Sequence, residues 1–371
     1  MAVFSLLAEA SREIPLLPAT IWHWVAFGAF VVVMLTLDLT VFHRHSHEPT
    51  LRESAMWTLF WCSLAFAFNG LIWFWARQTF DDPTEANRIA LEFLVGYVVE
   101  WSLSMDNVFV FAVIFTFFRV PLKYQYRVLF WGILGAVLMR LTFVLVGAAL
   151  LEKFIDAMLV FGLILIWTAY KLAFSHDEEV HPENNLLMRG ARRLFPVAKE
   201  SHGNRFFAVE SGRRCVTPLF LVLLVVESTD VMFAVDSVPA ILGLTKDTFI
   251  VFTSNVFAIL GLRALYFLLA GAMDLFRYLK YGLAGILGFV GGKMIADWVA
   301  HRFYGMHEHL VPIWASLLVI LVLLAIAVAA SLAAKWRAEA GGANANPEPN
   351  LDRPASARQE PSSESVPSDR H

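Results

Sequence analysis

Long apolar segments separated by short polar connections run through most of the chain. A helix needs about 20 mostly apolar residues to cross the hydrocarbon core of a bilayer. Segments of this kind occur at 21–42, 54–76, 89–118, 127–150, 155–173, 217–239, 249–270, 282–300 and 312–334. The third is too long for one straight span, so we expect its ends to project or its helix to break. The pattern predicts an all-α polytopic membrane protein with about nine transmembrane helices.

The composition fits a membrane protein and argues against several other classes. Hydrophobic residues make up 58% of the chain and charged residues 16%, whereas soluble domains carry about 25% charged residues. Cys62 and Cys215 are far apart and lack the spacing of a disulfide framework or a zinc site. We find no nucleophile–base pair and no glycine-rich phosphate loop. We therefore expect neither an enzyme nor a nucleic-acid-binding protein and no permanently bound cofactor, and the oligomeric state stays open.

Charge and polarity predict the topology and the order of the parts. Most loop lysines and arginines fall on one side of the predicted membrane, which places the N-terminus outside and the C-terminus in the cytoplasm. The polar, charged tail lacks the apolar residues for a core, so we expect it to be disordered. The expected parts are an outer N-terminal segment, two peripheral spans, a three-helix repeat, a cytoplasmic loop, a second three-helix repeat, a last span and the tail: 1–20, 21–88, 89–173, 174–216, 217–300, 301–334 and 335–371.

An internal repeat relates the third to fifth spans to the sixth to eighth. Charged residues recur at nearly equal spacing in the two halves: Asp106 and Asp230, Arg140 and Arg263, and Lys171 and Lys293. Chance similarity between apolar helices explains shared charged positions poorly. Because each copy holds three helices, the second copy must enter the membrane from the opposite side. Inverted repeats of this kind are typical of secondary transporters, whose binding site lies near the midplane where the copies meet.

Five carboxylates and one asparagine lie at or near the middle of the predicted bilayer. They are Glu100, Asp106, Glu227, Asp230 and Asp236, with Asn107. A charge at this depth costs at least about 2.5–3.5 kcal/mol on insertion scales, so these residues point to a function. The set contains oxygen donors and neither Cys nor His, which favours hard divalent cations such as Mg²⁺, Ca²⁺ or Mn²⁺. We expect the six residues to form a metal site at the repeat interface.

Four cations also lie within the predicted spans. We expect Arg140, Arg263, Lys293 and Lys171 to compensate the carboxylates or to gate the site. Lys171 lies near a span end, where a long cationic side chain snorkels to the interface. A simpler interpretation is that acids and arginines of neighbouring helices form structural ion pairs, which explains one pair well and five carboxylates less well. For Asp38, near the end of the first span, we expect an interfacial or packing role.

Helical spacing adds two expectations about faces. Glu227 and Asp230 are three residues apart, so they share one face of their helix. Gly288 and Gly292 form a small-residue pattern of the kind that lets two membrane helices approach closely.

Three motifs resemble those of a known family. The stretches "DNVFVFA" from Asp106, "STDVMFAVDSVPAI" from Ser228 and the following "FAILGLRALYFLL" are similar to the TerC family of bacterial membrane proteins, over about residues 21–334. That family is named for tellurium resistance and is related to the LysE exporter superfamily. The resemblance implies manganese export across the bacterial inner membrane, with Asp106, Asn107, Asp230 and Asp236 as essential residues.

We therefore expect a secondary transporter that exports Mn²⁺ as its substrate and takes protons as the counter-ion. Two alternatives stay open. The chain is either an exporter of Ca²⁺ or another solute, or a membrane component of a tellurium- or stress-resistance complex without transport activity. For an anion exporter we would expect arginines facing a cavity and few free carboxylates.

Overall fold

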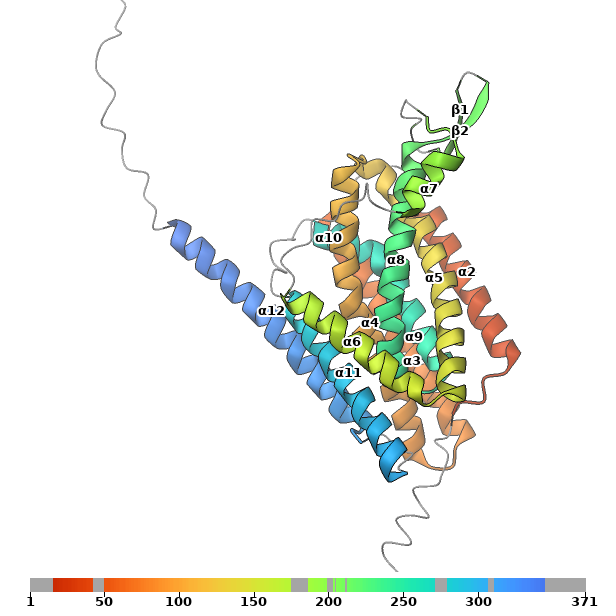
Figure 1. Ribbon diagram of the computed structural model, residues 1–371, viewed down its shortest axis with the longest axis vertical. Coiled ribbons are helices and arrows are strands. Elements are labelled where there is room, and N and C mark those ends of the chain that lie inside the picture. Colours follow the sequence, from red (N-terminus) through yellow and green to blue (C-terminus); the bar gives the residue numbers. More distant parts are fainter. Residues whose placement is uncertain are drawn as a thin grey trace, which may run out of the picture.

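The computed structural model describes residues 16–42, 50–174, 186–198, 203, 205–210, 212–270, 279–305 and 310–343 (Figure 1). Helices form almost all of this part of the chain. In order, the elements are α2 (Ile21–Phe42), α3 (Leu51–Thr79), α4 (Pro83–Phe117), α5 (Leu122–Lys153), α6 (Asp156–Phe174), α7 (Leu186–Leu194), β1 (Phe207–Glu210), β2 (Arg213–Val216), α8 (Pro218–Leu242), α9 (Thr248–Leu260), α10 (Leu262–Ala270), α11 (Leu279–Tyr304) and α12 (Ile313–Ala343).

The predicted set of membrane spans is confirmed. Eight helices of the described part are long and apolar enough to cross a bilayer. A ninth span results if the bent pair α9 and α10 is counted as one. The chain is therefore a multi-pass integral membrane protein.

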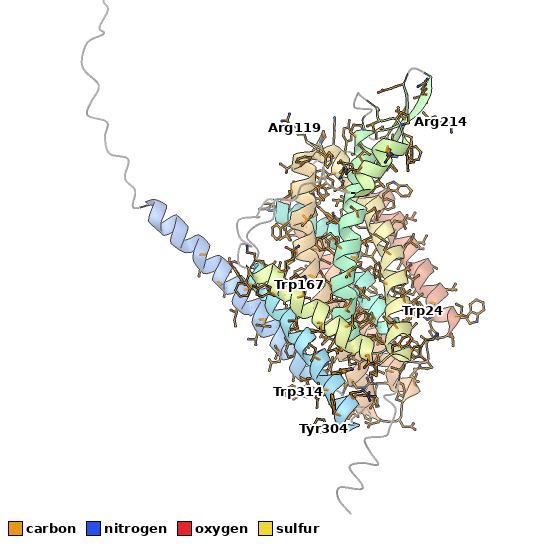
Figure 2. All side chains as sticks on the ribbon, viewed as in Figure 1. Trp24, Arg119, Trp167, Arg214, Tyr304 and Trp314 are labelled. Atoms are coloured by element: carbon orange, nitrogen blue, oxygen red, sulfur yellow. The ribbon has the colours of Figure 1, made fainter. Side chains whose placement is uncertain are left out.

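The two repeats run in opposite directions through the bundle. Figure 2 shows Arg119, which follows α4, and Arg214, which precedes α8, at one end of the molecule, whereas Tyr304 of α11 lies at the other. We call these the Arg119 end and the Tyr304 end. Helix α4 runs toward the Arg119 end and α8 runs away from it, so the first helices of the two copies are antiparallel. These opposite directions agree with the predicted inversion of the second repeat.

Packing between the repeats has two-fold character. Helix α4 packs against α9 and helix α5 against α8, and exchanging the two copies converts one pair into the other. Three further pairs join each helix to its own counterpart, namely α4 with α8, α5 with α9, and α6 with α11. The centre of the molecule is thus the interface between the copies.

The first two spans cover one side of this centre. An aromatic cluster joins these two spans to the centre. It consists of Phe27 of α2, Phe68 of α3, Phe93 of α4 and Phe257 of α9, and the ring centroids of its contacting pairs lie 4.7–6.0 Å apart. Helices α6, α11 and α12 lie on another side and are tilted relative to α5 and α8 (Figure 1).

Local sequence explains where the helices at the centre begin. Asp82 precedes Pro83 and accepts a hydrogen bond from the Thr84 amide at the start of α4. Thr217 precedes Pro218 in the same way at the start of α8. An N-cap followed by proline is a favoured helix start, because the cap satisfies a free amide and proline has none. The two related helices therefore share the same kind of start.

The structure decides between the two expectations for the long third span. Helix α4 is continuous from Pro83 to Phe117, so its ends project and it does not break. The break lies instead in the seventh span, where α9 and α10 meet at Gly261 with a bend of 41°.

The polar segments differ in part from the expectation. The helix α12 continues to Ala343, so residues 335–343 of the predicted disordered tail are helical. The central loop contains α7 and the hairpin β1–β2, in which Phe207 pairs with Val216. The rest of the tail and residues 1–15 lie outside the described residues.

Candidate functional site

A buried ion pair occupies the centre of the repeat interface. Arg140 of α5 and Glu100 of α4 are both 0% exposed, and Arg140 Nη1 lies 2.6 Å from Glu100 Oε1. The same nitrogen donates to Asn255 Oδ1 of α9 at 2.7 Å. The Asn255 amide nitrogen donates to the Val251 carbonyl, which turns its oxygen toward the arginine. Ser104 Oγ, one turn along α4, donates to Glu100 Oε1 at 3.3 Å.

Two carboxylates of α8 extend this group. Asp230 is 4% exposed and interacts electrostatically with both Arg140 and Glu100. Glu227 interacts with Asp230, as their shared helix face predicts. Its carboxylate lies directly over Gly135 of α5, where a Cβ atom would stand 2.2 Å from both oxygens. We call Glu100, Arg140, Glu227, Asp230 and Asn255 the central cluster.

The central cluster is rich in negative charge and incompletely paired. It holds three carboxylates and one guanidinium group if all are ionised. Within the part of the chain that the structure describes, Glu100 Oε2 and Asp230 Oδ2 are buried oxygens without a hydrogen-bond partner, and Arg140 Nε is a buried donor without one. A buried polar group that lacks a partner is costly. The cluster is therefore suited to binding a further cationic or hydrogen-donating species.

The other predicted ligands have different neighbours. Asp106 of α4 is partly buried and interacts electrostatically with Lys280 of α11. Asn107 beside it is buried. Asp236 of α8 accepts a hydrogen bond from Thr168 Oγ1 of α6 at 2.8 Å and interacts with Lys171 of the same helix. The structure thus joins Glu100, Glu227 and Asp230, and gives Asp106 and Asp236 partners on α11 and α6.

The four predicted compensating cations separate in the same way. Arg140 belongs to the central cluster, whereas its repeat counterpart Arg263 forms an ion pair with Asp38 of α2. The packing role expected for Asp38 therefore consists of this pair. Lys171 is exposed, as a residue near a span end is expected to be. Lys293 is 5% exposed and donates to the Gly243 carbonyl at 3.2 Å.

A ready-made metal centre is not visible in the part of the chain that the structure describes. No group of three or more His, Cys, Asp or Glu side chains there is arranged to hold a metal ion. The predicted six-residue metal site at the repeat interface stays a prediction. The histidines at 43–47 and 307–309 lie outside the described residues.

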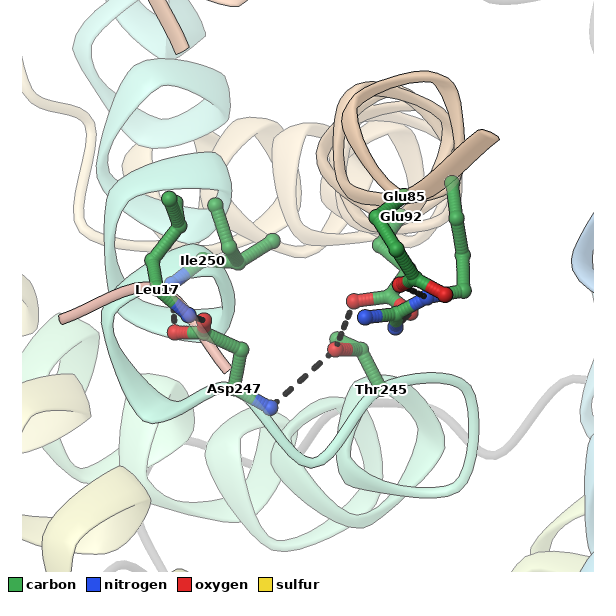
Figure 3. A network of polar contacts seen from close by, with 7 residues as sticks. Leu17, Glu85, Glu92, Thr245, Asp247 and Ile250 are labelled. Atoms are coloured by element: carbon green, nitrogen blue, oxygen red, sulfur yellow. Dashed lines mark hydrogen bonds and ion pairs between the residues drawn. The ribbon is translucent and has the colours of Figure 1, made fainter. Parts of the chain in front are cut away.

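A second polar network lies between α4 and the α8–α9 connection (Figure 3). Arg88 pairs with Glu85 and Glu92 on α4, and Glu92 Oε2 accepts from Thr245 Oγ1 at 2.6 Å. Asp247 is the N-cap of α9 and binds the amides of Phe249 and Ile250. Its other oxygen accepts from the Leu17 amide at 2.8 Å.

Burial raises the pKa of Asp247, and the amides of Leu17, Ile250 and Phe249 oppose that rise. The N-terminal segment is thereby attached to the start of α9.

Several residues of these groups are absent from the sequence-based prediction. Asn255, Glu92 and Asp247 have no counterpart in the repeat pattern that would single them out. Glu92 precedes Glu100 by eight residues, which places the two side chains about 80° apart around a continuous helix. Their spacing alone therefore does not single out Glu92. Asn255 carries no charge, and only its contact with Arg140 identifies it.

The chain is similar to known membrane proteins over most of its length. The model of the "Integral membrane protein TerC family" matches residues 85–339. The "Uncharacterized membrane protein STKORF319" of Myxococcus xanthus is 48% identical over 277 residues, which cover 74% of this chain and 84% of that protein. The "Putative membrane-bound redox modulator Alx" of Escherichia coli strain K12 is 43% identical over 273 residues, covering 73% of this chain and 85% of that protein.

A plant protein shares part of the chain. The "Thylakoid membrane protein TERC, chloroplastic" of Arabidopsis thaliana is 45% identical over 218 residues, which cover 59% of this chain and 56% of that protein. No solved structure matches the chain significantly.

Proposed function

The chain belongs to the integral membrane protein TerC family, and from this premise we propose that it is a secondary transporter exporting a divalent cation. We propose Mn²⁺ as the substrate and protons as the counter-ion. The proposal includes no enzymatic activity. It places the protein in a bacterial inner membrane with the Tyr304 end outside and the Arg119 end in the cytoplasm, because the basic loops favour that orientation.

One observation carries the proposal. Glu100 and Asp230 belong to opposite repeats, and among the described residues each keeps a buried carboxylate oxygen without a hydrogen-bond partner, beside Arg140. A divalent cation would neutralise the excess negative charge, and oxygen ligands suit Mn²⁺ and other hard cations. The location also fits, since inverted-repeat transporters bind substrate where the copies meet.

Proton exchange follows from the same chemistry. A carboxylate must lose its proton to bind a metal ion, so cation and proton compete for one group. Glu227 and Asp230 on α8 and Glu100 on α4 are thus able to release the cation when they are protonated. Asp106 and Asp236 are proposed to bind the cation at another stage of transport, because their contacts lie on α11 and α6.

An anionic substrate is less well supported. Both intramembrane arginines already have carboxylate partners, Arg140 with Glu100 and Arg263 with Asp38. An anion would have to displace these carboxylates, whereas a cation would complement them. Export of Ca²⁺ shares the oxygen-ligand chemistry and is distinguished only by measurement.

A role as a membrane component of a stress-resistance complex is the second candidate function. The α7–hairpin unit at the Arg119 end exposes Leu194, Phe207 and Val209 by 77%, 64% and 65%. Such exposed apolar side chains are suited to contact with another protein. A dithiol redox activity has less support, because Cys62 and Cys215 are both free and lie on separate elements.

The transport proposal is tested by cellular manganese content. The wild-type chain, Asp230→Asn, Asp106→Asn and the control Glu152→Gln would be expressed in a manganese-sensitive bacterial strain, and Mn, Ca and Mg measured by mass spectrometry. Glu152 is an exposed carboxylate at the end of α5. We expect the wild type and the control to lower cell Mn, and both aspartate variants to fail at matched membrane expression.

The outcomes separate the alternatives. Unchanged cell Mn with the wild type would exclude manganese export, and a fall in Ca alone would reassign the substrate. Full export by Asp230→Asn would remove the central cluster from the mechanism, while full export by Asp106→Asn would remove only that residue. Co-purified partners that survive both variants, without any change in metal content, would favour the complex-forming role.

A further inference from the structure

Lys293 is a deeply buried cation that lies outside the central cluster. It projects from α11 and is 5% exposed, and among the described residues it donates one hydrogen bond, to the Gly243 carbonyl. Gly243 is the C-cap of α8, the helix that carries Glu227 and Asp230. An ammonium group has three donors, so this single bond leaves most of its capacity unused. Lys293 thus connects to the end of the central-cluster helix without belonging to the cluster.

Two carboxylates lie near Lys293 without forming a contact ion pair with it in the described part of the chain. Glu92 of α4 and Asp297, one turn further along α11, interact with it electrostatically. Each has another partner, since Glu92 binds Arg88 and Thr245 and Asp297 accepts from the Leu310 amide at 2.9 Å. The amine is therefore held near negative charge but not locked to it.

The other helices around α11 add little charge near the amine. On α6, Asp156 accepts from Trp298 Nε1 and Lys171 interacts with Asp236. On α12, residues 313–334 contain no ionisable side chain. Arg88 on α4 and Asp247 at the start of α9 both interact electrostatically with Glu92. The local balance around Lys293 is thus set mainly by Glu92 and Asp297.

The position links this amine to one end of the bundle and to the central cluster. Asp297 lies about two turns before Tyr304, where α11 ends, and it accepts a hydrogen bond from the Leu310 amide. Glu92 and Glu100 are eight residues apart on one continuous helix, which corresponds to about 12 Å. A proton site at Lys293 would therefore be separate from the proposed cation site in the central cluster.

We propose that Lys293 binds one further exchanged proton, in addition to those taken up by the carboxylates of the central cluster, with Glu92 and Asp297 as the groups that exchange it with the Tyr304 end. The inference rests on the proposed function and names an additional site for its counter-ion. The incoming proton binds the lone pair of neutral Nζ to give an ammonium group, and it leaves to water when the amine becomes neutral again. Protonation strengthens the bond to the Gly243 carbonyl and so acts on α8.

The residue type supports this assignment. Lysine gives up its proton readily when it is buried, whereas arginine keeps its proton under all ordinary conditions. An arginine would preserve the contact with a helix C-terminus, which favours positive charge, but it would not exchange. Lys293→Arg therefore stands for the protonated state and Lys293→Gln for the neutral state, and neither variant can exchange a proton at this position.

The test is cation accumulation by the full chain reconstituted in liposomes. With the membrane potential clamped at zero, an imposed pH gradient of about one unit supports about a tenfold Mn²⁺ concentration ratio for each proton exchanged. We expect Lys293→Gln and Lys293→Arg to exchange one proton fewer, so their steady-state Mn²⁺ ratio should be about tenfold below that of the wild type. Exchange of Mn²⁺ for Mn²⁺ at equal pH should persist in both. Lys153→Gln, an exposed lysine at the end of α5, is the control and should match the wild type.

Each result decides the proposal. An unchanged accumulation ratio in Lys293→Gln or Lys293→Arg would overturn it, and loss of Mn²⁺–Mn²⁺ exchange in both variants would assign Lys293 a structural role instead. Wild-type Mn²⁺ transport that ignores the pH gradient would refute the proton site while leaving cation transport intact. Absence of any wild-type Mn²⁺ transport would instead refute the proposed function on which the inference rests.

Discussion

Gly135 on α5 offers a way to move Glu227 without removing any ionisable group. A Cβ atom at this position would stand 2.2 Å from both carboxylate oxygens of Glu227 and 2.4 Å from its Cδ. The carboxylate therefore occupies the space that an alanine methyl group requires. Gly135→Ala should displace the acid and keep the composition of the central cluster.

The displacement can be estimated from the contact distances. Ordinary van der Waals contact with a Cβ atom begins near 3.4 Å, so oxygens at 2.2 Å must retreat by 1.2 Å, the difference between the two distances. Glu227 is flexible, and an off-rotamer torsion costs about 0.5–1.5 kcal/mol. Alanine in place of glycine within a helix recovers about 0.5–1 kcal/mol. We expect little net change in stability, because the two effects nearly cancel.

Function should respond much more strongly than stability. A cation ligand displaced by more than 1 Å loses its coordination distance, so we expect the half-saturating Mn²⁺ concentration to rise about tenfold or more, equivalent to about 1.4 kcal/mol. Mn²⁺ exchange in liposomes measures this concentration, and the thermal midpoint in detergent measures stability. Gly132→Ala is the matched control, since its Cβ would meet only Val226 Cγ1, at 3.2 Å, one turn away on the same two helices.

A clear result would refute this reasoning. If Gly135→Ala binds Mn²⁺ as tightly as both the wild type and the control Gly132→Ala, then Glu227 does not act on the cation from its position over α5. If both variants weaken Mn²⁺ binding equally, the cause is the packing between α5 and α8, and the placement of Glu227 is not involved.

Two further predictions concern packing and buried charge. Gly291→Ala should lower stability by about 1–3 kcal/mol through overpacking, because its Cβ would lie 2.8 Å from the Gly162 carbonyl oxygen. Gly292→Ala is the control and should not lower stability, because its Cβ would meet open space. Equal thermal midpoints for the two variants would contradict the close contact between α6 and α11. Asp38→Asn should cost about 3–5 kcal/mol, because it leaves Arg263 buried with a neutral partner. Denaturant unfolding measures that loss, and a variant as stable as the wild type would show that the pair contributes nothing.

Much of the architecture was predictable from the sequence because it depends on local composition. Apolar length alone identifies the spans, and charges that recur at nearly equal spacing indicate the duplication. An odd number of helices in each copy then requires the inversion, which the opposite directions of α4 and α8 display. The proximity of Glu227 to Asp230 was equally accessible, since residues three apart on a helix lie on the same face.

Helix rotation limits how far such reasoning reaches into the site. Glu100 and Asp106 are six residues apart, which places them about 120° apart on a straight helix. A break would have allowed them to converge, but α4 is continuous, so Glu100 meets Arg140 while Asp106 is turned toward Lys280. Whether α4 breaks depends on its neighbours as much as on its own residues.

The same limit applies to the glycine pattern and to the paired arginines. Gly288 and Gly292 suggested the close approach of two helices, yet Gly291 makes that contact and Gly292 faces open space. One residue along a helix turns the side chain by about 100°, which a spacing pattern cannot resolve without a partner surface. Likewise Arg140 and Arg263 are equivalent in sequence but meet different acids.

The sequence by itself determined which residues this protein places in the membrane and that they are duplicated with inversion, because both properties depend only on composition and on spacing along one chain. Only the tertiary structure decided which of the buried charges meet. That choice depends on the rotation and packing of helices distant in sequence, and a low-dielectric interior makes every such contact, or its absence, energetically large.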